Sequence, residues 1–241
     1  MTRWPKLAKP PIREAVIDIQ VRPSPEFDLR NFPDEIAGYE TRTEVFGHHV
    51  DIKESEGSLT TTDNSEHIGF KYQPPDRSAV VQFRKDRFTY SIIEGYESWP
   101  VIKQLAQEYW SCFLKASQPK RVARVATRYI NILNLPPPFS SFSEHLTSPP
   151  PVPSGLPNLL SSFLTRVVLH EPREELVLIL TQALKQAKED AVPITLDIDV
   201  FSEIDLSPTS DQIWSILDKC RNFKNRAFFE SLTEKTLELY K

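Results

Sequence analysis

The fold is decided by residues 79–135, which contain AVVQFRKDRFTYSII (79–93), WPVIKQLAQEYWSCFLKAS (99–117) and RVATRYINILNL (124–135). The first segment has β-branched and aromatic residues on both sides of a charged triplet, which predicts a hairpin or one long bent strand. In the second, apolar residues recur at helical spacing behind a proline in the first turn, which predicts an amphipathic helix. The third segment predicts a long strand that ends at a proline.

The segments on either side of this stretch add more strands and a second helix. Ile12–Val21 places Ala15, Ile17 and Ile19 on one face and a mixed set on the other, which is typical of a half-buried strand. The same reasoning predicts short strands within 38–59 and at 68–72, strands at 163–170 and 192–203, a polar loop at 60–66, a strand or a helix start at 175–184, and a helix from about residue 210.

Antiparallel strands followed by an aromatic-bearing helix occur twice along the chain, which indicates an internal duplication. The sequence therefore predicts an α+β fold, with an antiparallel sheet built from two duplicated halves and helices packed on one face. The expected division is an N-terminal half at 1–135, a Pro/Ser-rich linker at 136–157 and a C-terminal half at 158–241. A groove between the halves is expected to follow from this arrangement.

Composition narrows the classes of function. The chain has 241 residues, 39% of them hydrophobic, and a formal net charge of −4, which argues against a dedicated nucleic-acid binder. It has no signal-peptide pattern and no apolar run long enough for a membrane span, and its two cysteines suit a cytoplasmic protein. With six glycines and no glycine-rich phosphate loop, no cofactor is expected and a non-enzymatic protein is favoured.

Three short motifs carry a resemblance to a known family. They are KPPIRE (9–14), VQFRKDRF (81–88), which precedes an aromatic helix, and RYIN (128–131), which precedes a Pro-rich loop. In this order and spacing the chain resembles, over most of its length, a sporadically distributed bacterial protein family of unassigned function. The resemblance implies no substrate or mechanism. Sporadic distribution is compatible with an accessory of a bacterial defence or toxin–antitoxin system.

A cluster of polar residues on the predicted strands is the first candidate site. Arginine's planar guanidinium suits carboxylate or phosphate recognition, so neighbouring strands could build a site for a protein partner or a small anionic ligand. The competing interpretation is a cross-strand ladder of surface salt bridges. The cluster contains Glu14, Gln82, Arg84, Asp86, Arg87, Arg124, Arg128 and Asn131, and the residues predicted to contact a ligand or partner are Glu14, Arg84, Asp86, Arg87, Arg128 and Asn131.

Two other classes of function remain open. Asp197 and Asp199 lie two apart on a predicted strand, as carboxylates of a metal-dependent phosphodiesterase or nuclease could. No histidine or lysine accompanies them at a recognisable spacing, and a solvated strand face is favoured. Basic residues interleaved with rings, such as Phe83, Arg87 and Tyr90, could stack single-stranded nucleic acid. Here the favoured interpretation places the rings in the core.

Overall fold

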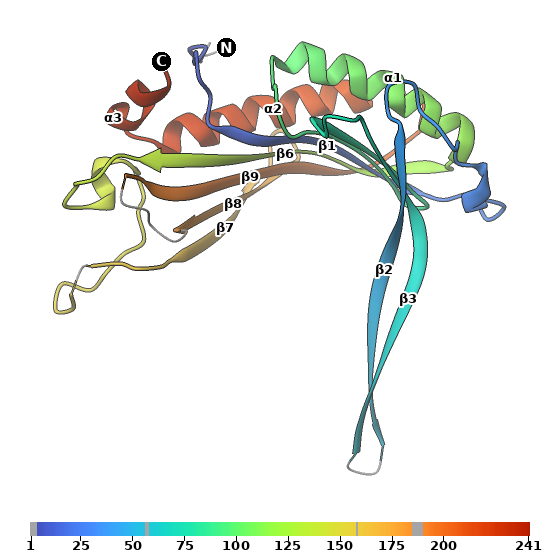
Figure 1. The fold of residues 1–241 in the computed structure, drawn as a ribbon, viewed down its shortest axis with the longest axis horizontal. Helices are drawn as coiled ribbons and strands as arrows, with labels where there is room; N and C mark the ends of the chain where they lie inside the picture. Colours follow the sequence, from blue (N-terminus) through green and yellow to red (C-terminus); the bar gives the residue numbers. More distant parts are fainter. Residues whose placement is uncertain (1–3, 56–57, 158, 185–189) are drawn as a thin grey trace.

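The computed structural model describes residues 4–55, 58–157, 159–184 and 190–241, and within them the strands form one antiparallel sheet of nine (Figure 1). The strand order is β2-β3-β4-β5-β1-β6-β9-β8-β7, and every pairing is antiparallel. The α+β class and the antiparallel sheet are therefore confirmed.

Runs of strands are followed by α-helices, as the sequence predicts, but β2 and β3 are each longer than the short strands predicted within 38–59 and at 68–72. The strands are β1 (Ile12–Arg22), β2 (Thr41–Ser55), β3 (Ser58–Gln73), β4 (Ala79–Arg84), β5 (Arg87–Ile92), β6 (Arg121–Leu135), β7 (Leu164–Glu171), β8 (Leu176–Leu184) and β9 (Val192–Leu206). The α-helices are α1 (Trp99–Ser117), α2 (Gln212–Ser231) and α3 (Glu234–Leu237), and the 3-10 helices are η1 (Leu29–Asn31), η2 (Phe142–Glu144) and η3 (Glu238–Tyr240).

β1 and β6 lie side by side near the middle of the sheet and carry much of its core. Their apolar residues face each other in register, with Ala15 opposite Tyr129 and Ile19 opposite Val125. α2 contacts β6, β8 and β9, whereas α1 contacts β5. Since β6 pairs with both β1 and β9, one continuous sheet crosses the boundary expected between the two halves.

The predicted local structure largely matches the observed elements. The charged triplet at Lys85 is a tight turn between β4 and β5, α1 spans the predicted helix, and the ambiguous segment 175–184 is the strand β8. The loop predicted at Thr60–Glu66 is wrong, because these residues belong to β3 and pair with β2. β2 and β3 extend beyond β4 as a long arm that projects from the body of the sheet (Figure 1).

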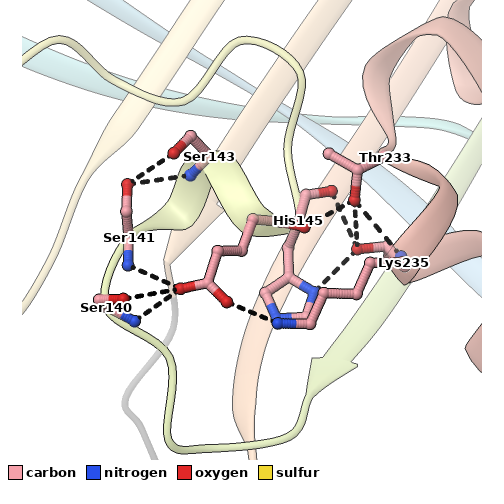
Figure 2. A network of polar contacts seen from close by, with 8 residues as sticks. Ser140, Ser141, Ser143, His145, Thr233 and Lys235 are labelled. Atoms are coloured by element: carbon pink, nitrogen blue, oxygen red, sulfur yellow. Dashed lines mark hydrogen bonds and ion pairs between the residues drawn. The ribbon is translucent and has the colours of Figure 1, made fainter.

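The Pro/Ser-rich segment predicted as a linker is tied to the C-terminal helix by a polar network (Figure 2). The Glu144 carboxylate accepts hydrogen bonds from the backbone N–H of Ser140 at 2.7 Å and from Lys235 Nζ at 2.5 Å. Thr233 Oγ1 donates to the Glu144 carbonyl, and the buried ring of His145 lies 2.9 Å from Thr236 Oγ1. The part of the segment around η2 is therefore held against α3 by these hydrogen bonds.

None of the helices in the described part of the chain is both long and apolar enough to span a membrane.

Gly69 of β3 lies opposite Arg84 of β4 at a point where the two backbones approach closely. A Cβ at this position would overlap the Phe83 carbonyl group and come within 2.6 Å of Arg84 Cα. We therefore expect Gly69→Ala to lower the free energy of unfolding by roughly 2 kcal/mol or more, measured by urea denaturation. Gly155→Ala is the control, because nothing lies within 4 Å of its Cβ position, and an equal loss in both variants would contradict the expectation.

Candidate functional site

The sheet has one face that carries charged and polar side chains, which we call the polar face. Successive residues of a strand point to opposite faces, and residues paired across antiparallel strands share a face. Asp18 on β1 therefore shares its face with Thr89, its partner on β5, and with Arg124 and Arg128 on β6. Asp197 and Asp199 on β9 lie on this face too, because Asp199 pairs with Arg128.

Asp18 is the most enclosed carboxylate of the polar face, with 13% of its side chain exposed. Its Oδ2 accepts a hydrogen bond from Thr89 Oγ1 at 2.9 Å, and its Oδ1 accepts one from Arg124 Nη1 at 3.2 Å. Arg87 Nη1 lies 3.7 Å from Oδ2. Burial raises the pKa of Asp18, and the neighbouring Arg87, Thr89 and Arg124 oppose this shift because they favour the charged form.

Arg124 joins two carboxylates that lie on different strands. Its second guanidinium nitrogen, Nη2, donates to Asp199 Oδ2 at 3.3 Å. The plane of the guanidinium lies over the ring of Phe201, 4.2 Å from its centroid, which shields the group from water. Burial also raises the pKa of Asp199, opposed by Arg124 and Arg128. Arg124 is thus the central cation of a charge ladder that runs across β5, β1, β6 and β9.

The ladder ends on β9 in a two-pronged pair between Arg128 and Asp197. Arg128 Nε and Nη2 donate to the two Asp197 carboxylate oxygens at 2.9 and 2.6 Å. This pairing raises the pKa of Arg128, and Glu14 adds a smaller electrostatic effect of the same sign. Glu14 therefore lies near the ladder, as the sequence predicted.

The other end of the ladder is formed by the β4–β5 hairpin and is less well paired. Arg84 and Arg87 lie directly opposite each other in the register, at the base of the turn that contains Asp86. Arg84 Nε lies 3.4 Å from Asp86 Oδ1, yet both atoms are buried with no hydrogen bond to any residue that the structure describes, and so is Arg87 Nε. Buried polar atoms normally have partners, so this end has unused hydrogen-bonding capacity.

Asn131 does not join the other predicted site residues. Its side chain is buried on the opposite face, where Nδ2 donates to the Leu196 carbonyl at 3.0 Å and to the Tyr129 carbonyl at 3.4 Å. Asn131 is three residues from Arg128, an odd number, so alternation along a strand sends the two side chains to opposite faces. Alternation along the strand is visible in the sequence, and it separates Asn131 from Arg128.

The rings considered for nucleic-acid stacking lie in the core. Phe83, Phe88, Tyr90 and Tyr129 are all almost completely buried, and Phe83, Phe88 and Tyr90 pack in the same cluster as α1. This confirms the interpretation that the rings are interior while charged neighbours occupy the other face.

The carboxylates considered for a metal site already have cations beside them. Asp197 is engaged by Arg128 and Asp199 by Arg124, so a metal ion would have to displace a guanidinium at each. In the part of the chain that the structure describes, no three His, Cys, Asp or Glu side chains are grouped as metal ligands.

The network around His145 has the residue types of a hydrolase site without its geometry. His145 Nδ1 lies beside Thr236, and its Nε2 has no hydrogen-bond partner among the described residues. Ser141 Oγ contacts Ser143 Oγ instead, at 2.8 Å. The Thr236 hydroxyl beside the ring is buried and donates its hydrogen to the His145 carbonyl at 2.9 Å, so the ring does not hold it as a nucleophile.

Two cavities lie away from the charge ladder. One, of about 590 Å³, lies between the η1 region and α1, and the other, of about 710 Å³, lies under the Pro-rich segment beside Leu184 and Val192. No residue of the ladder lines either cavity. The charge ladder therefore shares no wall with either of these two cavities.

Comparisons with known proteins give no match, since neither a scan against protein-family models nor a search of the curated proteins finds a similar sequence.

Lys224 is an unusual residue on the other side of the sheet. It is buried between α2 and β6, with Nζ 3.7 Å from the centroid of the Tyr129 ring. Among the described residues it has no carboxylate partner. Burial lowers the pKa of Lys224 to about 7, and the positive charge of Arg221 adds to the shift.

Arg124→Met tests the ladder. The variant leaves two shielded carboxylates without their shared cation, and we expect a loss of roughly 2–3 kcal/mol in the free energy of unfolding at pH 7. The loss should shrink at about pH 4.5, because Asp18 and Asp199 have raised pKa values and need less compensation once protonated. Urea denaturation at both pH values measures this.

Arg121→Met is the matched control for Arg124→Met. Arg121 lies on the same strand and pairs with the exposed Asp205, so its loss should lower the free energy of unfolding much less than the loss of Arg124 does. Equal losses for the two arginines, or a loss at Arg124 that does not change with pH, would contradict the ladder as described.

Lys224 makes stability depend on pH in a defined window. Its pKa falls from 10.5 in the unfolded chain to about 7, so between these values the unfolded state binds more protons and stability rises with pH. We expect Lys224→Met to raise the free energy of unfolding at pH 7 and to remove this rise. The difference between wild type and variant, measured by denaturation at pH 7 and about 9.5, should narrow as pH increases. A constant difference would rule the effect out.

Proposed function

We propose that this protein is a non-enzymatic binding protein whose polar face recognises carboxylate or phosphate groups displayed by a partner. The contact residues are Arg84 and Arg87, with Asp86 between them and Arg128 and Glu14 farther along the ladder. The observation that carries the proposal is that Arg84 and Arg87 lie directly opposite each other across the hairpin, with 27% and 31% of their side chains exposed. An anionic group at the exposed parts of the two guanidiniums would add hydrogen-bond acceptors there.

Charge balance within the polar face supports this division of roles. Arg124 lies between the two carboxylates Asp18 and Asp199, so its main effect is on the sheet itself. Among the described residues, the cations Arg84 and Arg87 have Asp86 and Asp18 beside them, at 3.4 and 3.7 Å. Two guanidiniums therefore meet at the hairpin, where 27% and 31% of their side chains are exposed to solvent.

We further propose that the sheet consists of two like-built halves with their helices on one face. This proposal moves the boundary between the halves from residue 135 to before Arg121, so that β6 is the first strand of the second half. The strand before each long helix then pairs with the first strand of its own half: β5 with β1 and β9 with β6. The two first strands then pair with each other, antiparallel, near the middle of the sheet. α1 and α2 are drawn on the same side of the sheet in Figure 1, and residues of both pack into one core cluster.

The resemblance to a sporadically distributed bacterial family extends this proposal to a cytoplasmic role as an accessory of a defence or toxin–antitoxin system. Its support is the three sequence motifs. We do not propose the phosphodiesterase alternative, because Asp197 and Asp199 are both engaged by arginines.

The test is affinity purification from the native host followed by mass spectrometry, comparing wild type with the double variant Arg84→Gln, Arg87→Gln. We expect the double variant to lose at least tenfold of the captured partner, because glutamine keeps hydrogen-bonding capacity but lacks the charge that an anionic group requires. Arg128→Ala should give a smaller loss. Arg121→Gln is the control, since Arg121 is a more exposed arginine, 42% against 27% and 31%, and is paired with Asp205. Undiminished capture of every partner by the double variant would overturn the proposal.

A further inference from the structure

β7 is an edge strand whose apolar side chains are exposed on both of its faces. It is the last strand in the order of the sheet and pairs only with β8. Leu164, Val167, Val168 and Leu169 are 72%, 46%, 47% and 47% exposed. Val167 and Leu169 point to one face and Leu164 and Val168 to the other, so neither face of this strand is covered.

The hydrogen-bonding edge of β7 is open as well. The Leu184 N–H donates to the Phe163 carbonyl at 3.0 Å, and these two residues continue the β7–β8 register. In an antiparallel pair, hydrogen-bonded residues alternate along the strand, so the odd-numbered residues of β7 bond to β8. The N–H and C=O groups of Leu164, Arg166, Val168 and His170 therefore point outward.

Native sheets usually protect such an edge with charged side chains, above all lysine, or with proline, a bulge or a covering loop. β7 has no lysine and no proline, and its pairing with β8 is regular from Leu164 to Glu171. Its exposed charged residue is Arg166, and its one acidic residue, Glu171, is already paired with Arg226 of α2 at 2.9 Å. An edge with one exposed arginine and an apolar centre can pair with another chain.

We propose that β7 pairs with β7 of a second copy of this protein, which joins two sheets into one around a two-fold axis at Val168. A two-fold axis perpendicular to the sheet makes the two strands antiparallel and keeps equivalent faces on the same side. Val168 then forms a hydrogen-bonded pair with itself, and Arg166 pairs with His170 of the second copy. The three pairs supply about six hydrogen bonds.

The side chains favour this register over its neighbour. With the axis at Val168, Val167 lies opposite Leu169 of the second copy on one face, and two valines meet on the other. With the axis at Val167, Val168 would lie opposite Arg166 and Leu169 opposite Thr165. Only the first register matches apolar with apolar residues throughout the middle of the strand. A second copy is therefore the occupant for which this edge is complementary.

The first test is the oligomeric state of the purified protein. One strand pair is a small interface, so we expect a reversible dimer that forms between about 5 and 200 µM in sedimentation velocity, with a limiting mass twice 27.7 kDa. Val168→Lys should weaken it at least tenfold, because the ammonium group enters the apolar centre. Val168→Ile, which keeps a β-branched apolar side chain, should dimerise like wild type.

Two outcomes of the first test would overturn the proposal. One is a monomer throughout the concentration range, and the other is a dimer that Val168→Lys leaves unchanged. Thermal unfolding shows whether Val168→Lys is folded, which we expect because the position is half exposed. If the Arg84 and Arg87 variants kept their partner, the dimer result would be unaffected, because these residues lie on β4 and β5, six and five strand intervals from β7.

The second test reads the register directly by disulfide formation, in a Cys112→Ser background because Cys112 is exposed. Val168→Cys should form a covalent dimer under mild oxidation, since Cα atoms of a hydrogen-bonded pair are about 5.5 Å apart. Val167→Cys should cross-link only when mixed with Leu169→Cys. Leu239→Cys, 42% exposed, controls for random collision. The proposal fails if Val168→Cys cross-links no faster than this control. It also fails if Val167→Cys alone cross-links faster than the mixture of Val167→Cys and Leu169→Cys.

Discussion

The antiparallel pairing of β1 with β6 is the interaction on which the rest of the structure depends. Its register puts Ala15 opposite Tyr129 and Ile19 opposite Val125 on the core side. The same register places Asp18, on the polar face, diagonally between positions 124 and 128. The pairing of β1 with β6 thus brings together the core residues of the two strands on one face and the centre of the charge ladder on the other.

Local elements could be predicted from the sequence because their signals are local. The charged triplet between apolar runs gives the β4–β5 hairpin, and helical spacing after Pro100 gives α1. The segment at Thr60–Glu66 was misassigned because its polarity resembles a loop, whereas pairing along β2 holds it as a strand. Here long-range pairing overrides composition.

The candidate site was only partly predictable, because its partners come from distant strands. Arg84, Asp86 and Arg87 are close in sequence and were found together. Arg124 contacts Asp18 and Asp199, which are 106 and 75 residues away, and this depends on β1 and β9 flanking β6. The sequence does not indicate that β9 lies next to β6. It therefore suggests a possible metal site at Asp199, because the arginine that pairs with it, Arg124, is 75 residues away.

The ladder separates charges that serve the fold from charges available to a ligand. A buried carboxylate is costly unless a cation accompanies it, so Asp18 and Asp199 require Arg124 whatever the protein binds. Removing Arg124 leaves buried carboxylates without a compensating cation, which lowers the free energy of unfolding. Arg87 also helps to compensate Asp18, from 3.7 Å, whereas Arg84 lies closer to Asp86. An external anion at the hairpin would share these guanidiniums with Asp18 and Asp86, and Arg124 and Thr89 would remain bonded to Asp18.

The two proposals together fix how far apart two anion sites would lie. In a sheet extended through β7, eleven strand intervals separate β5 of one copy from β5 of the other. At about 4.8 Å an interval, the sites lie roughly 50 Å apart measured across the strands, and on the same face of the sheet. The twist of about 20° per strand turns the two sites to different directions in space. A small anion would bind each site independently. A partner long enough to engage both would gain avidity, and its binding would then weaken when the dimer dissociates.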